Sequence, residues 1–159
     1  LVHQPALDIS FLAGRYPVSQ GQEHAARAGA ERAGDTADRV RVVPGKPDAS
    51  ELVRRIRGHA LPRMPFDGPP YLSDDDIRLI EDWVAHGARD ANGKVAPNPA
   101  GATVRLHGTL RPGWRLDELE LDVGAHTRID KSPRPGDYVE VRGRLDESGN
   151  VKVGRLRRR

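Results

Sequence analysis

The sequence contains no cysteine among its 159 residues. Disulfides, thiolate metal sites and covalent attachment of a c-type haem are therefore excluded within this chain. Aromatic residues make up 4% and apolar residues 36% of the sequence, which favours two small cores over one large core. Because no run of 18 apolar residues occurs, the sequence predicts no transmembrane helix. It also shows no signal-peptide pattern after Leu1.

The net charge of +3 is distributed unevenly along the chain. Residues 1–100 carry 13 Lys and Arg against 14 Asp and Glu, whereas residues 101–159 carry 13 against 9. The second part is thus basic, and the chain ends on Arg157, Arg158 and Arg159. The sequence also holds 17 Gly and 13 Pro, so we expect much of it to be turn or irregular structure.

Two segments have the apolar spacing of amphipathic helices. In residues 47–57 apolar residues recur at helical spacing, and Gly58 is a natural stop. Its other face carries three arginines, Arg54, Arg55 and Arg57. Residues 74–86 follow a Ser73 N-cap, with Asp76 at the capping-box position. The sequence therefore predicts two helices separated by a proline-rich loop.

The apolar period changes after residues 91–101, which read as a Pro/Gly/Asn-rich linker. Within residues 102–159, apolar residues alternate with charged ones in short runs, and turn signals separate the runs. Five strands in under 60 residues are typical of a small five-stranded β-barrel of OB type. We therefore predict two separable domains, residues 1–90 and 102–159, of which residues 1–40 are poorly defined.

Residues 42–90 resemble the C-terminal half of a bacterial cytochrome c-type domain. The resemblance rests on VVPGKPDAS before the first helix, on the RMP loop followed by PPYLSDDDI, and on the last helix, IEDWVAHGA. It implies an all-α domain and a periplasmic or secreted protein. It also implies that His3 and Met64 are the axial ligands of a haem iron. Val2 stands where the C-x-x-C-H motif has a cysteine, so this haem would be held without a covalent bond.

The C-terminal part resembles a small β-barrel domain of unknown function that is found in secreted proteins. The matching pieces are HGTL, the turn at residues 125–129 and the segment GDYVEVRG at residues 136–143. The last piece combines a turn glycine, an alternating strand and a second glycine at a bend. This resemblance implies an architecture and no particular activity.

Three functions stay open at this point. The first is electron transfer by a haem domain to a redox partner protein. The second is a cofactor-free interaction module that binds an envelope component. The third is nucleic-acid binding by an OB-like barrel, which is disfavoured because Trp114 and Tyr138 are its only large aromatic residues. An enzyme is not expected, since the sequence shows no nucleophile–base pair, carboxylate constellation or phosphate-binding glycine loop.

Overall fold

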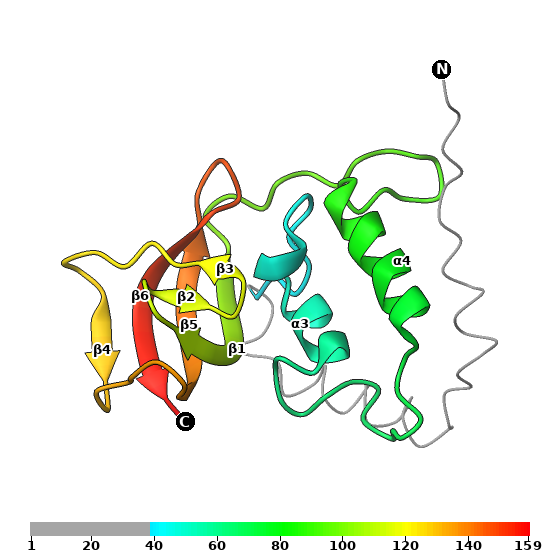
Figure 1. Ribbon diagram of the computed structural model, residues 1–159. Coiled ribbons are helices and arrows are strands. Elements are labelled where there is room, and N and C mark those ends of the chain that lie inside the picture. Colours follow the sequence, from blue (N-terminus) through cyan, green and yellow to red (C-terminus); the bar gives the residue numbers. More distant parts are fainter. Residues whose placement is uncertain (1–38) are drawn as a thin grey trace, which may run out of the picture.

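The computed structural model describes residues 39–159, and Figure 1 gives the element labels used below. In this part of the chain, two helices and a short 3-10 turn precede six strands. In chain order the elements are η1 (Pro47–Ala49), α3 (Glu51–Arg57), α4 (Asp74–Ala85), β1 (Thr103–Arg111), β2 (Arg115–Leu116), β3 (Leu119–Glu120), β4 (Arg128–Asp130), β5 (Tyr138–Leu145) and β6 (Val151–Arg158).

Both helices have the end structures that the sequence predicts, an N-cap on α4 and a glycine at the end of α3. Ser73 Oγ accepts a hydrogen bond from Asp76 N at 3.2 Å and donates one to Asp76 Oδ2 at 2.8 Å, which caps α4. Gly58 has φ 84° and ends α3, a left-handed conformation that glycine adopts at little cost. Trp83, on α4, is half-buried and its indole N–H donates to Arg89 O at 2.8 Å.

The six strands form one mixed sheet in the order β3-β2-β1-β5-β6-β4. The long strands β1, β5 and β6 pair antiparallel, whereas β4 pairs with β6 in parallel. The register places Leu106 opposite Val141, and Val141 opposite Leu156. Directly paired residues share one face of a sheet. These residues therefore define an apolar inner face, and the Arg, His and Glu residues that alternate with them lie on the outer face.

The main core lies against the inner face of this sheet. Val43 and Ala49, which precede α3, are 0% and 2% exposed and belong to the same cluster as the strand residues. The cluster is completed by Val104, Leu106, Leu110, Leu116, Leu121, Val139, Val141, Leu145, Val151, Val153 and Leu156. The segment before α3 is thus part of the core that the sheet forms.

The predicted all-α cytochrome c-type domain is wrong. Residues 39–159 contain two helices, of 7 and 12 residues, and most of their regular structure is the sheet. The side of α3 that faces the sheet carries the buried polar residues Glu51 and Arg54. Since both pair with β1, that side does not form an apolar wall for a cofactor.

The predicted five-stranded barrel is also wrong, because the sheet has six strands and is open. Strands β3 and β4 lie at its two edges and are not paired with each other. They contain two and three residues, too few to close the sheet along its length. Residues 91–101 run between α4 and β1. The prediction that residues 1–90 and 102–159 form separable domains stays a prediction. Within residues 39–159, no helix is long and apolar enough to span a bilayer.

Candidate functional site

Helix α3 covers one edge of β1 before Leu110, since β2 pairs with this edge at Leu110 and Arg111. Glu51 Oε2 accepts a hydrogen bond from His107 N at 3.1 Å, and Arg54 Nε donates one to His107 O at 2.9 Å. Further along the same edge, Val40 N donates to Thr103 O at 3.1 Å. Two side chains of the helix thus supply the acceptor and the donor that a neighbouring strand would supply. The backbone groups of His107 on this edge are thus satisfied, which hinders pairing with another chain at this point.

Arg54 is completely buried and forms an ion pair with Asp117. It also donates to Asp48 O at 3.1 Å and to Leu116 O at 3.4 Å. Burial lowers the pKa of Arg54 below its usual value, while the charge of Asp117 acts in the opposite direction. A guanidinium stays charged under these conditions. Because its donors face protein acceptors, Arg54 attaches α3 to the sheet and is not a ligand-binding group.

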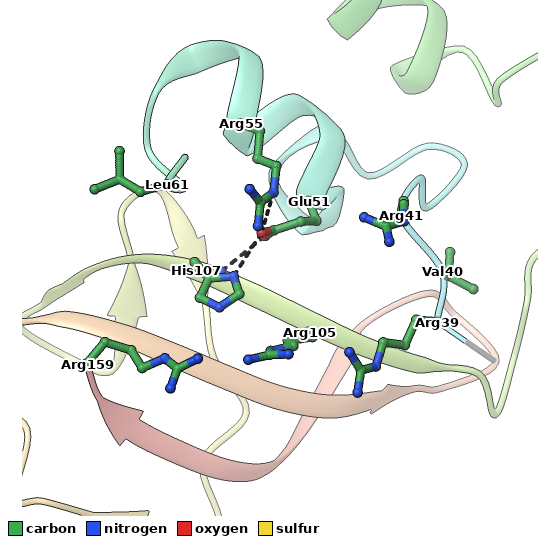
Figure 2. A pocket seen from close by; sticks show the side chains of 9 residues that line it. All are labelled: Arg39, Val40, Arg41, Glu51, Arg55, Leu61, Arg105, His107 and Arg159. Carbon is green, nitrogen blue, oxygen red and sulfur yellow. Dashed lines mark hydrogen bonds and ion pairs between the residues drawn. The ribbon is translucent and has the colours of Figure 1, made fainter. Parts of the chain in front are cut away.

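A pocket of about 320 Å³ lies where α3 meets the outer face of the sheet. Figure 2 shows Arg39 and Arg41 on one side of the pocket, Arg159 on the other, and Arg105 and His107 on the strand between them. Seven of the nine lining side chains are ionisable. The lining consists of Arg39, Val40, Arg41, Glu51, Arg55, Leu61, Arg105, His107 and Arg159.

The five arginines of the pocket come from four separate parts of the chain. Arg39 and Arg41 precede η1, Arg55 lies on α3, Arg105 lies on β1, and Arg159 follows β6. The pairing of β1, β5 and β6 fixes the last two, because it places the end of β6 across β5 from the first strand. The site therefore depends on the tertiary fold and not on a local motif.

Among residues 39–159, Glu51 is the only carboxylate that lines the pocket, and its oxygens accept hydrogen bonds from the protein. Oε1 accepts from Arg55 Nε at 3.1 Å and lies 2.9 Å from His107 Nδ1. Oε2 accepts from the backbone of His107. An ionised carboxylate only accepts hydrogen bonds, so Nδ1 of His107 is the protonated ring nitrogen in this contact. Glu51 thus holds His107 and Arg55 in place.

Glu140 forms ion pairs with three arginines at the base of the pocket. Its side chain is 2% exposed and accepts from Arg105 Nη2 at 2.5 Å and Arg142 Nε at 2.6 Å, and Arg159 Nη2 lies at 2.9 Å. Burial alone would raise the pKa of Glu140, but hydrogen bonds and charge from Arg105 and Arg142 outweigh it and lower the pKa to about 2. Three guanidinium groups therefore share one carboxylate and keep an excess of positive charge.

The low pKa of Glu140 predicts a loss of stability in acid. A carboxyl group with a depressed folded pKa stabilises the protein above its unfolded pKa, and this contribution is lost as the pH falls. The pKa of a glutamate carboxyl is usually 4.5, and that of Glu140 in the folded protein is about 2. Ionised Glu140 therefore contributes on the order of 3 kcal/mol to the free energy of unfolding, and this contribution is lost as the pH falls from the first value to the second. Urea unfolding at about pH 6 and about pH 2.5 measures it. Wild type should lose about 3 kcal/mol more than Glu140→Gln over this interval, and equal losses would contradict the assignment.

Donors within the pocket are left without protein acceptors. Arg105 Nε is buried and has no hydrogen-bond partner among residues 39–159. The Arg41 side chain is exposed and forms no hydrogen bond or ion pair with another residue of the same range. A buried donor without an acceptor costs about 1–3 kcal/mol. An anion in the pocket would gain charge-assisted hydrogen bonds from the exposed planar guanidinium forks, such as that of Arg41.

Met64, one of the two residues predicted as haem ligands, does not line this pocket. His3 lies outside the described residues. Met64 lies in the loop between α3 and α4, where its side chain is half-buried and its N–H donates to Arg55 O at 3.2 Å. The assignment of iron ligation to these two residues stays a prediction. Within residues 39–159, no three His, Asp or Glu side chains are grouped as a metal site would need.

The sequence predictions missed the pocket residues, although part of the signal was present. Arg105 and His107, like Glu140 and Arg142, are spaced by two residues, and this spacing places each pair on one face of a strand. The predictions used this alternation only to identify strands. The register that places Arg105 opposite Arg142 joins residues 37 positions apart, and no local pattern reveals it.

Comparison with known proteins adds no assignment. No family model, no curated protein and no solved structure matches the chain.

Proposed function

We propose that the protein is a cofactor-free binding module that holds an anionic group of its ligand in the arginine pocket. The convergence of five arginines around one carboxylate, Glu51, carries this proposal. Surface arginines are normally dispersed or paired one to one with acids. Among residues 39–159 the two nearby carboxylates, Glu51 and Glu140, are both saturated by protein donors, so the charge of the exposed Arg41 is available to a ligand.

The chemistry of the lining favours carboxylate, phosphate or sulfate groups. Guanidinium groups bind such oxyanions through two parallel hydrogen bonds, and these bonds are shorter and stronger than those between neutral groups. The pocket is partly enclosed by α3 and the sheet, and a lower local dielectric strengthens the attraction. Leu61 and Val40 add small apolar surfaces at the edge. A compact anionic group of a larger ligand fits these features.

Binding rather than catalysis is proposed because of the state of His107. Its Nδ1 lies 2.9 Å from Glu51 and its Nε2 lies 3.4 Å from Glu140, so both nitrogens face protein carboxylates. An imidazole that transfers protons to a ligand needs a nitrogen directed at that ligand. The electron-transfer hypothesis is not carried further, because it depends on the cytochrome resemblance that the fold contradicts.

Isothermal titration with sodium sulfate, phosphate and citrate tests the proposal. Chloride is used to keep the ionic strength constant, so that general screening does not change during the titration. We expect saturable binding of one anion per chain, and citrate should bind tightest because it carries the most charge. The control is Arg78→Gln, which removes an exposed arginine of α4 whose ion-pair partner among residues 39–159 is Asp75; it should bind like wild type. Heats that never saturate, or that are equal for all anions, would contradict a specific site.

A further inference from the structure

The pocket continues into a row of arginines that crosses the outer face of the sheet. The register pairs Arg105 with Arg142, Arg142 with Arg155, and Arg155 with Arg128. Directly paired residues lie on one face of a sheet, and neighbouring strands are about 4.8 Å apart. These four positions therefore form a line of about 14 Å across β1, β5, β6 and β4. Arg105 belongs both to this arginine row and to the pocket.

In the arginine row the guanidinium groups are exposed to solvent, whereas the carboxylates that pair with them are largely buried. Glu140 and Asp130 are 2% and 19% exposed, whereas the side chains of Arg142, Arg155 and Arg128 are 42%, 35% and 72% exposed. Arg155 and Arg128 both pair with Asp130, just as Arg105 and Arg142 both pair with Glu140. Two carboxylates thus orient four guanidinium groups, and each guanidinium keeps donors that a ligand can use.

We infer that the ligand is an acidic polysaccharide whose first charged group occupies the pocket and whose following groups lie along the arginine row. This inference rests on the proposed function and specifies its ligand. One pyranose ring is about as long as the gap between neighbouring strands, so successive charged sugars meet successive arginines. In an extended peptide, side chains on one face are about 6.6 Å apart, which fits the row less well.

The outer face offers little to the bases of a nucleic acid. Proteins that bind single strands stack bases on exposed aromatic rings. The aromatic side chain beside the pocket is Tyr138, whose ring stacks against His107 with centroids 6.3 Å apart. Its hydroxyl accepts a hydrogen bond from Leu61 N at 2.7 Å. Tyr138 is thus held by the protein, and the contacts available along the row are those of guanidinium groups with anions.

Titration of oligosaccharides of increasing length tests the inference. One series carries carboxylates (galacturonic acid and its oligomers), a second carries sulfates (heparin-derived oligomers), and oligo-dT of matched charge is the opposing probe. At constant ionic strength, affinity should rise about tenfold from one to four charged units and then level off, because each further exposed ion pair adds a few-fold at most. A rise in either saccharide series supports the inference.

The double variant Arg128→Gln/Arg155→Gln connects this length dependence to the row. In this variant the ratio of tetramer to monomer affinity should fall close to one, while Arg78→Gln keeps the wild-type ratio. Circular dichroism and binding of sulfate in the pocket report that the variant is folded. If sulfate and the monosaccharide bind but length brings no gain, the inference fails and the proposed function stands. If neither binds, the proposed function itself fails. Equal or tighter binding of oligo-dT overturns the polysaccharide assignment.

Discussion

Replacement of Arg54 with alanine is expected to lower the free energy of unfolding by about 3–5 kcal/mol, the usual cost of removing one partner from a buried ion pair. The change leaves the Asp117 carboxylate, whose side chain is 7% exposed, without its cation. It also removes the donor to His107 O on the edge of β1 that α3 covers. A domain of this size has a total stability of about 5–15 kcal/mol, so the variant should be much less stable or unfolded. Urea unfolding followed by circular dichroism measures the effect.

Two further variants separate the ion pair from loss of packing. The double variant Arg54→Met/Asp117→Leu replaces both charges with apolar groups, and it should recover part of the lost stability because no buried charge is left alone. Gly108→Ala provides an independent test, since a Cβ at this position would meet both Arg54 Nη2 and Asp117 Oδ2. It should destabilise the protein by separating the pair. A loss below about 1 kcal/mol for Arg54→Ala, within the range of exposed ion pairs, would contradict the role given to this residue.

The double variant Arg41→Gln/Arg159→Gln is expected to weaken sulfate binding more than 100-fold. Hydrogen bonds to charged groups contribute about 1.5–3 kcal/mol each, and each 1.4 kcal/mol changes the dissociation constant about tenfold. Both residues line the pocket. Arg41 is exposed, and the Arg159 side chain is 40% exposed. The two replacements therefore remove ligand contacts with little effect on the core.

The matched control for this variant is Arg78→Gln, which removes an arginine of α4 outside the pocket. A second control, Arg41→Lys, keeps the charge and removes the planar fork, so it should bind with an intermediate affinity. Melting temperatures within a few degrees of wild type show that the pocket variants remain folded. Sulfate affinity of the double variant within a few-fold of the control would mean that these arginines do not bind the anion.

Local sequence signals predicted the helices well, because their physical causes are local. Ser73 and Asp76 form their capping contacts within four residues, and Gly58 ends α3 through its own backbone conformation. The prediction of 74–86 for the last helix agrees with Asp74–Ala85 to one residue. The alternation of apolar and charged residues likewise identified the long strand β5, which begins in the segment at residues 136–143. These signals need no knowledge of the tertiary fold.

Tertiary packing explains what the sequence did not predict. Arg54 was placed on the polar face of its helix, yet it is completely buried because Asp117 and the edge of β1 supply partners for its guanidinium. The barrel prediction was wrong because the number of strands does not show whether a sheet closes. Strand β4, at Arg128–Asp130, was missed because it is three residues long and has one apolar side chain, Ile129. Its parallel pairing with β6 joins distant parts of the chain.

Heteronuclear NMR of the arginine Nε–Hε groups tests the central claim most directly. Arg41 lines the pocket, and its exposed side chain has no hydrogen-bond or ion-pair partner among residues 39–159, so its Nε–H is a donor that an anion can reach directly. As sodium sulfate is added at constant ionic strength, the Arg41 signal should move along a saturating curve that gives the calorimetric dissociation constant, while the Arg78 signal stays in place. Small, linear and equal shifts of all the exposed arginines, with no saturation at Arg41, would contradict a specific anion site.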